Sequence, residues 1–354
     1  MASATRDDVL SALNAPELDS AGFLSLISPA ALDCRAEMSA KAESVRMARF
    51  GRTVKLYTPL YVSNHCVNRC VYCGFNASSR EPRRRLSLEE LEKELDAIAS
   101  FGVDSILLVS GEDPKAISLD YLKAAVSMSR ERFSYVAVEI YPLDGEGYSE
   151  LRRAGLDGLT LYQETYDRAI YERVHPSGPK ADYDARLSAV EAGAKAGVSV
   201  IGLGVLLGLC DWRFDAVSLA AHAAWLKRRY WRISLQFSFP RITPIEGGFD
   251  APSPVSEEEL ETMVLAFRLF FPDAEISIST RESRAFRDRI AVSAATTLSA
   301  ASKVVPGGYS DEGDGELGQF SLRDTRSVEE MVGDLSALGL DVVFKDWDAA
   351  FAAI

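Results

Sequence analysis

Cys66-Val-Asn-Arg-Cys70-Val-Tyr-Cys73 is the stretch of the sequence that decides how the rest of the chain is interpreted. It holds three of the five cysteines, at an asymmetric CxxxCxxC spacing. Three thiolates are one fewer than the four that close a structural zinc or iron–sulfur site. The spacing therefore predicts a [4Fe–4S] cluster bound by Cys66, Cys70 and Cys73, with one iron open to a small-molecule ligand.

Two other uses of these cysteines are weaker. A zinc site commonly needs a second CxxC or CxxH pair, which the sequence lacks, and His65 is too close to Cys66 to join without strain. A disulfide framework is disfavoured because five cysteines in 354 residues are few and odd in number. Zinc binding and chance spacing stay as alternatives.

The composition is that of a soluble globular protein, with 47% hydrophobic and 26% charged residues. A net charge of −13 argues against nucleic acid or an anionic membrane as the main partner. No apolar run reaches the roughly 18 residues that a membrane span needs, and the first residues do not resemble a signal peptide. We expect a cytoplasmic protein with reduced thiols.

Short apolar runs alternate with helical patterns, as in a (β/α)8 TIM-type barrel. A doubly wound sheet is the alternative, but its glycine-rich phosphate turn is missing. One helix opens with a capping box, Ser87 with Glu90, and another with Ser256. The expected strands are Lys55–Val62, Ser105–Ser110, Tyr135–Tyr141, Gly158–Gln163, Val198–Val205, Ile233–Phe239, Glu275–Thr280 and Thr296–Ala300.

We expect this barrel to cover residues 51–300, between two extensions. Residues 1–50 read as helical. Residues 301–354 hold a Gly/Asp-rich loop at 306–315, a helix from about Ser327 and the segment Lys345-Asp-Trp-Asp348, and we expect them to pack on or cap the barrel.

Polar residues fall at several strand ends, where functional groups lie in such barrels. The cysteines directly follow the first expected strand, and other strands end near Glu112, Glu164, Arg241 and Arg281. Any one of them can be an ordinary loop residue. Together they predict a site at one end of the barrel.

The cysteine triplet, with Tyr72 before its last cysteine, resembles that of the radical S-adenosylmethionine (SAM) superfamily. Other segments resemble its aromatic amino-acid lyase branch, above all the tyrosine lyases of thiamine thiazole biosynthesis. They are spread from about residue 50 to the end of the sequence: Tyr61-Val-Ser-Asn-His-Cys66, Cys73-Gly-Phe-Asn76, Tyr162-Gln-Glu-Thr-Tyr166, Val174-His-Pro-Ser-Gly-Pro-Lys180, Phe237-Ser-Phe-Pro-Arg241, Ser279-Thr-Arg-Glu-Ser283, Phe286-Arg-Asp288, Pro306-Gly-Gly-Tyr309 and Lys345-Asp-Trp-Asp348.

The resemblance implies one reaction. SAM bound to the cluster is cleaved to methionine and a 5′-deoxyadenosyl radical, which abstracts a hydrogen atom from L-tyrosine. The Cα–Cβ bond then breaks, giving p-cresol and 2-iminoacetate (dehydroglycine), a precursor of the thiazole ring. The implied cofactors are a [4Fe–4S] cluster and SAM, and a capped barrel offers the closed cavity that such a radical needs.

The resemblance also implies which residues bind SAM. The segment Ser110-Gly111-Glu112 resembles the glycine-glutamate motif that binds the SAM ammonium group, and Gly111 lets the backbone approach closely. We expect Arg186 to bind the SAM carboxylate, and Glu164 to bind the amine or the ribose. Tyr72 is expected to place backbone groups against adenine.

The tyrosine carboxylate needs a cation that fixes its orientation, and a guanidinium can bind it with two hydrogen bonds. Arg281, at the end of the seventh strand, is our candidate, and Ser299 on the eighth strand can bind the same group. The alternative for Arg281 is a structural ion pair with Glu282 or Asp288.

Several choices stay open at this stage. The acceptor of the phenolic proton is not assigned among Tyr162, Glu164 and Arg241. The hydrogenase-maturation tyrosine lyase carries a second cluster on further cysteines, and no cysteine follows Cys210, so we expect a one-cluster enzyme. A related tryptophan lyase is the alternative substrate assignment. A non-catalytic cluster-binding protein is the alternative of another class, but it would not need charges at strand ends.

The resemblance implies two protein partners. A thiazole synthase is expected because the imine product hydrolyses readily in water. A reducing electron donor of the flavodoxin or ferredoxin type is expected because the cluster must be reduced.

Overall fold

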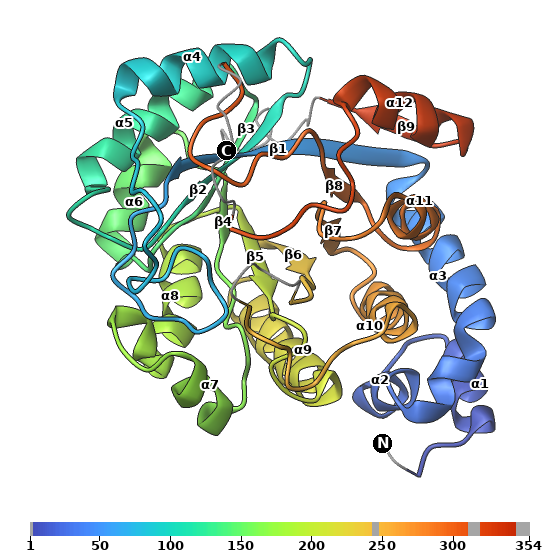
Figure 1. The fold of residues 1–354 in the computed structure, drawn as a ribbon. Coiled ribbons are helices and arrows are strands. Elements are labelled where there is room, and N and C mark those ends of the chain that lie inside the picture. The colour runs from blue at the N-terminus through green and yellow to red at the C-terminus, as the bar shows by residue number, and fades with distance from the viewer. Residues whose placement is uncertain (1–2, 243–247, 311–318, 345–354) are drawn as a thin grey trace.

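A closed barrel of parallel strands forms the centre of the computed structural model, which describes residues 3–242, 248–310 and 319–344 (Figure 1). The order is β2-β3-β4-β5-β6-β7-β8-β1, and β1 closes the ring by pairing with β2 as well as β8. The expected (β/α)8 barrel is confirmed. Its strands are β1 (Thr53–Ser63), β2 (Ser105–Ser110), β3 (Tyr135–Glu139), β4 (Gly158–Thr160), β5 (Val200–Gly204), β6 (Ser234–Ser238), β7 (Glu275–Ile278) and β8 (Thr297–Ser299).

Helices surround the barrel and begin at residues that cap their first turn. The expected capping box of Ser87 with Glu90 is present, and Ser256 forms another with Glu259. The helices after the first strand are α4 (Leu88–Ala99), α5 (Leu119–Arg130), α6 (Gly145–Arg153), α7 (Arg168–Val174), α8 (Tyr183–Lys195), α9 (Trp212–Arg229), α10 (Glu257–Phe270) and α11 (Arg284–Ser293).

Six of the eight barrel strands, β3 to β8, are two or three residues shorter than the sequence predicts, and β4 and β8 show one reason. The run expected at Gly158–Gln163 is a strand only over Gly158–Thr160, and the last strand covers Thr297–Ser299. Each is followed by a residue with a positive φ that is not glycine, Glu164 at 69° and Ala301 at 49°. Such a residue turns the chain out of the extended conformation, so apolar composition alone overestimates the strand.

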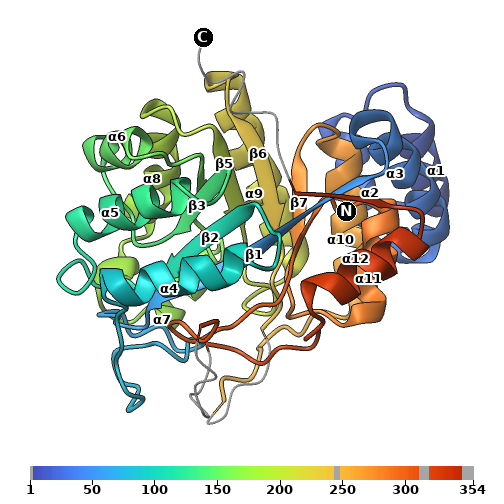
Figure 2. The same ribbon diagram turned by 90° about the horizontal axis from the view of Figure 1, so that it is seen from above.

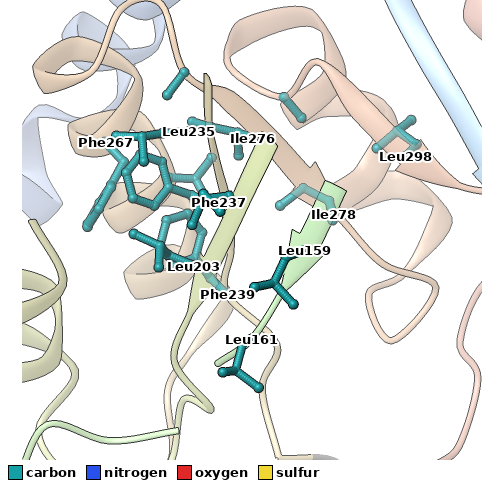
Figure 3. Packing of buried hydrophobic residues seen from close by; sticks show 14 of the residues in the cluster. Leu159, Leu161, Leu203, Leu235, Phe237, Phe239, Phe267, Ile276, Ile278 and Leu298 are labelled. Carbon is teal, nitrogen blue, oxygen red and sulfur yellow. The ribbon is translucent and has the colours of Figure 1, made fainter. Parts of the chain in front are cut away.

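The main hydrophobic core lies between the strands and the helices around them. Leu235 and Phe237 of β6 face outward, and Phe237 meets Phe267 of α10 at 4.9 Å between ring centroids (Figure 3). The alternating residues Gln236 and Ser238 line the barrel interior. Successive side chains of a strand point to opposite faces of the sheet, so the apolar ones face the helices and the polar ones face the inside of the barrel. These inward side chains fill the interior only in part.

The first helices pack at the start of β1, against α10 and α11 (Figure 1). Arg46 is fully buried there and donates to the carbonyls of Gly51, Thr53 and Ala295, at 2.8–3.0 Å. These bonds satisfy a cation that would otherwise be costly to bury. The elements are α1 (Arg6–Asn14), α2 (Ser20–Leu26), a 3-10 turn (Pro29–Cys34) and α3 (Arg35–Phe50).

The segments after β8 cross the end of the barrel where the loop after β1 also lies (Figure 2). Pro306 forms a bridge with Tyr61, and the Tyr61 hydroxyl donates to Gln319 Oε1 at 2.7 Å. The expected helix is present as α12 (Val328–Ala337), and β9 (Asp341–Val343) pairs with the start of β1. The Lys345–Asp348 segment and residues 311–315 of the Gly/Asp-rich loop lie outside the described residues.

No helix among the described residues combines the length and the apolar character needed to cross a bilayer.

Candidate active site

The three cysteines lie on the loop that connects β1 to α4, at the carboxyl end of the barrel strands. Tight turns shape this loop, because Cys73 donates its backbone N–H to Cys70 O (3.3 Å) and Asn76 donates to Cys73 O (3.1 Å). All three cysteine side chains line one cavity. The structure therefore brings the predicted ligand set together.

The thiols fit a cluster better than a single metal ion. Burial raises the pKa of Cys70 to about 12 and also raises that of Cys73, and a positively charged metal group would stabilise their thiolates. Within the described ranges, no three Cys, His, Asp or Glu side chains are arranged around one ion. A cubane cluster takes each thiolate on a different iron, so its ligands need not converge on one point.

The end of β2 lies directly against the cysteine loop. A Cβ at Gly111 would sit 2.3 Å from the carbonyl oxygen of His65, so only glycine fits. Val67 N–H donates to the carbonyl of Glu112 at 3.1 Å. This close approach places Ser110 and Glu112 in the wall of the cysteine cavity.

Two acids and two bases form a buried ion-pair network in the same cavity. Arg186 of α8 lies 2.9 Å from Glu112 and 3.7 Å from Glu164. Lys180 lies 2.7 Å from Glu164 and 4.0 Å from Glu112. Asn68 of the cysteine loop also donates to Glu112, at 2.8 Å. The predicted residues Glu112, Glu164 and Arg186 are thus neighbours, and Lys180 is a member that sequence reasoning missed.

The network keeps its acids ionised. Burial raises the pKa of Glu112, but Arg186 and Lys180 outweigh it and hold this pKa below its ordinary value. For Glu164 burial is likewise outweighed, by Lys180 and then Arg186. The two negative and two positive side chains of the network neutralise one another. A zwitterionic ligand can therefore bind by replacing one carboxylate with its own carboxylate and one cation with its own ammonium group.

Glu164 occupies its place at a conformational cost. Its φ of 69° lies in the left-handed region that disfavours a residue with a Cβ. The position is held by Leu206, whose N–H donates to the Glu164 carbonyl at 2.8 Å, and by the ion pair with Lys180. Strain of this kind is often kept where it aims a functional side chain.

A second cavity adjoins the first and shares part of its lining. Arg281 borders both cavities, whereas Ser299 borders only the second. The guanidinium carbon of Arg281 lies 3.6 Å from the ring centroid of Phe320. Ser299 is buried, and its Oγ accepts from Thr280 N–H at 3.1 Å.

The ion pairs weighed for Arg281 are not formed in the described structure. Glu282 pairs with Arg241 through both carboxylate oxygens, and Asp288 pairs with Arg326 at 2.9 Å. Among the described residues, no carboxylate lies within ion-pair distance of Arg281, so its guanidinium can receive an anion.

Of the three candidate acceptors of the phenolic proton, the structure places two at the cavities and one away from them. Tyr162 borders both cavities and Glu164 borders the cysteine cavity. Arg241 borders neither, because it is held by Glu282 and by the carbonyl of Val255.

Glu139 is a second residue that the sequence reasoning passed over. It ends β3 and borders both cavities. Burial and then the charge of Glu164 raise its pKa to about 7, against the opposing effect of Arg281. The expected strand ran to Tyr141, so Glu139 comes to a strand end, where functional groups lie, only because β3 ends earlier.

Tyr72 contacts the cysteine cavity from its outer side. Its hydroxyl lies 2.7 Å from His175 Nε2, and burial lowers the pKa of His175 to about 3. The imidazole is therefore neutral and serves as a hydrogen-bond partner. Lys180 lies 5.9 Å from the centre of the Tyr72 ring.

Comparisons with known proteins agree with this geometry. The model of the Radical SAM superfamily matches residues 60–218, and that of the Biotin and Thiamin Synthesis associated domain matches residues 238–341. The fold and the cysteine site therefore define a radical SAM enzyme, a class that uses SAM and an iron–sulfur cluster.

Particular relatives narrow the class. The 2-iminoacetate synthases of Salmonella typhimurium and Escherichia coli are each 42% identical over 346 residues, 98% of this chain and 92% of theirs. A crystal structure of HydG, a maturase of the [FeFe]-hydrogenase, matches with a TM-score of 0.91 at 30% identity, over 99% of this chain and 79% of that one. The chain belongs to the 2-iminoacetate synthase family, which confirms the expected enzyme class and function.

Proposed function

We propose that the chain cleaves the Cα–Cβ bond of L-tyrosine to p-cresol and 2-iminoacetate. The observation that carries the proposal is the junction of a three-cysteine cavity with a second cavity that is bordered by Arg281, which has no carboxylate partner among the described residues. The relatives named 2-iminoacetate synthase supply the product. A [4Fe–4S] cluster on Cys66, Cys70 and Cys73, with SAM on its open iron, would supply the 5′-deoxyadenosyl radical.

The ion-pair network is proposed to hold the amino-acid part of SAM. Glu112 and Glu164 would accept from its ammonium group, with Ser110 and the backbone of Gly111 beside it. Arg186 and Lys180 would bind its carboxylate, because a carboxylate can replace either glutamate as their counter-ion. Lys180 extends the predicted set. Tyr72 is proposed to border the adenine.

The second cavity is proposed to hold tyrosine, with its carboxylate on Arg281 and Ser299. Tyr57 and Tyr61 line the same cavity and can pack against an aromatic ring. Fixing the carboxylate determines which atom faces the radical, and this positioning is the main task left to the protein.

The division of labour along the chain is also proposed. Residues 51–300 would form the catalytic barrel, residues 1–50 a helical extension, and residues 301–354 a cover for the cavity. A thiazole synthase is the proposed recipient of the imine, and a flavodoxin or ferredoxin the proposed electron donor. A cytoplasmic location fits the five free cysteines, because such compartments keep thiols reduced.

The test is anaerobic turnover of the cluster-loaded protein with SAM, dithionite and tyrosine. We expect 5′-deoxyadenosine and p-cresol from the wild type. Arg281→Ala should still form 5′-deoxyadenosine but lose p-cresol by about 100-fold or more, as expected when a bidentate carboxylate contact is removed. Arg173→Ala, at an exposed arginine of α7, is the matched control and should behave as wild type.

Two outcomes would contradict the proposal. Absence of 5′-deoxyadenosine under reducing conditions would rule out radical chemistry and favour a non-catalytic cluster protein. Products from tryptophan but not from tyrosine would move the substrate assignment to the related lyase.

A further inference from the structure

Glu139 and Arg281 place opposite charges where the two cavities meet. Glu139 ends β3 and Arg281 follows β7, so they approach the barrel interior from different strands. Both border the cysteine cavity and the second cavity. An α-amino acid carries an ammonium group and a carboxylate on one carbon, and this pair of charges is complementary to it.

The reacting part of the substrate belongs at this junction. With a cluster on the cysteines and SAM beside it, the radical would be formed in the first cavity. The second cavity extends away from them along Tyr57, Tyr61 and Phe239, which suit an aromatic ring. The α-carbon and its two charged groups must therefore lie between the two, next to Glu139 and Arg281.

Among the carboxylates that line the two cavities, Glu139 is the one that forms no ion pair within the described chain. Glu112 and Glu164 pair with Lys180 and Arg186, and Glu282 pairs with Arg241. Within the described chain, Glu139 takes part in no ion pair and in no side-chain hydrogen bond. It is also only half-buried, because part of its surface faces the cavities.

We propose that Glu139 binds the α-ammonium group of the substrate and accepts one of its protons, so that the radical meets a neutral amine. One N–H bond breaks, its electron pair stays on nitrogen, and the proton forms an O–H bond with the Glu139 carboxylate. No electrons are gained or lost in this step. The inference rests on the proposed tyrosine lyase function.

The surroundings of Glu139 suit this exchange. Burial and Glu164 raise its pKa to about 7, while Arg281, Lys180 and Arg186 oppose the shift. A carboxyl group whose pKa lies near the working pH can both accept and release a proton. The other titratable groups that interact with its charge are the hydroxyls of Tyr57, Tyr61 and Tyr162.

The test compares two ligands that differ only in the ammonium group, L-tyrosine and 3-(4-hydroxyphenyl)propanoate. Calorimetry with the cluster-loaded, unreduced protein and SAM measures binding without turnover. Glu139→Gln should weaken L-tyrosine about 10- to 100-fold, the loss expected for a charge-assisted contact. It should leave the desamino ligand within about 2-fold, and Glu146→Gln, at an exposed glutamate of α6, should change neither.

Other results would overturn the proposal. Equal weakening of both ligands would move Glu139 to the phenol end of the substrate, and no change in either would remove it from the site. If the wild type bound neither ligand and formed no p-cresol, the lyase function itself would fail, which is a distinguishable result.

Two further measurements do not depend on how well Glu139→Gln folds. In the wild type, the preference for L-tyrosine over the desamino ligand should rise as pH rises through about 7, where Glu139 ionises. A constant preference between pH 6 and 8 would contradict the proposal. Glu139→Asp keeps the charge and should retain most of the preference.

Discussion

At the scale of single residues, the site depends on one strained position. Glu164 has a φ of 69° and yet carries the carboxylate that joins Lys180 and Arg186. Glycine adopts this conformation without cost, but it has no side chain to offer. The molecule therefore accepts a less stable backbone in return for a charge in the cavity.

This cost can be measured by replacing Glu164 with glycine and with alanine. Both changes remove the carboxylate, but only alanine keeps the disfavoured φ. We expect Glu164→Gly to have a free energy of unfolding about 1 kcal/mol larger than Glu164→Ala, by urea denaturation. At Glu146 in α6 the order should reverse, because glycine weakens a helix. Equal stabilities at position 164 would show that the backbone is not strained.

At the scale of elements, the end of β2 and the cysteine loop must touch. The proposed cluster site depends on the absence of a side chain at Gly111, where backbone atoms leave no room. The obstructing atom is the carbonyl of His65, which is main chain and cannot rotate away. A substitution there must displace the loop that carries the cysteines.

Gly111→Ala should therefore lower the iron bound per chain after reconstitution. We expect a loss of more than half of the iron and of the visible absorbance, because the loop moves away from β2. Far-ultraviolet circular dichroism should stay near that of the wild type, since the barrel is not involved. Gly145→Ala is the control, because a Cβ there meets nothing within 4 Å. Full iron content in Gly111→Ala would contradict the structure.

Sequence patterns predicted the helices and strands well, but they predicted the tertiary contacts between them less well. The alternation of strands with helices and the capping boxes follow from local chemistry, so the barrel could be expected from the chain. Lys180 belongs to the segment Val174–Lys180, but nothing local shows that it reaches Glu164 from a 3-10 turn (Pro179–Ala181) 16 residues along the chain. Glu139 was missed because the expected strand ran to Tyr141, which placed this glutamate inside a strand and not at its end. Such contacts form only when the barrel closes and brings distant segments together, and the local sequence pattern does not show which segments meet.

At the scale of the whole molecule, a buried network fastens the segment after β8 to the barrel. Arg287 of α11 is fully buried and donates to Asp324 and to the carbonyl of Ser299. Arg326 also donates to Asp324 and reaches Asp334 of α12 at 2.7 Å. Removing one member leaves a buried charge without a counter-ion, which is far costlier than losing a surface pair.

Asp324→Asn should lower the free energy of unfolding by about 3–5 kcal/mol at pH 6. Burial raises the pKa of Asp324, but Arg326 and Arg287 outweigh it and lower the pKa to about 2. The stabilisation is therefore complete above the ordinary value of 3.8 and is lost as pH falls toward 2. Urea denaturation at pH 6 and pH 3 should show that the wild type loses more stability than the variant.

The exposed pair of Arg52 and Asp341, 3.5 Å apart, provides the control. Asp341→Asn should cost less than about 1 kcal/mol, because solvent screens the charges. If Asp324→Asn behaved like Asp341→Asn, the buried network would not be what fastens the segment.

The contact between Gln319 and Cys73 has a consequence for the order of events during protein synthesis. Gln319 donates to the Cys73 sulfur at 3.9 Å across a separation of 246 residues. At about 5–20 residues per second, roughly 10–50 s pass between translation of the two positions. The cysteine loop thus leaves the ribosome long before Gln319, and the contact can form only after all eight barrel strands have been synthesised.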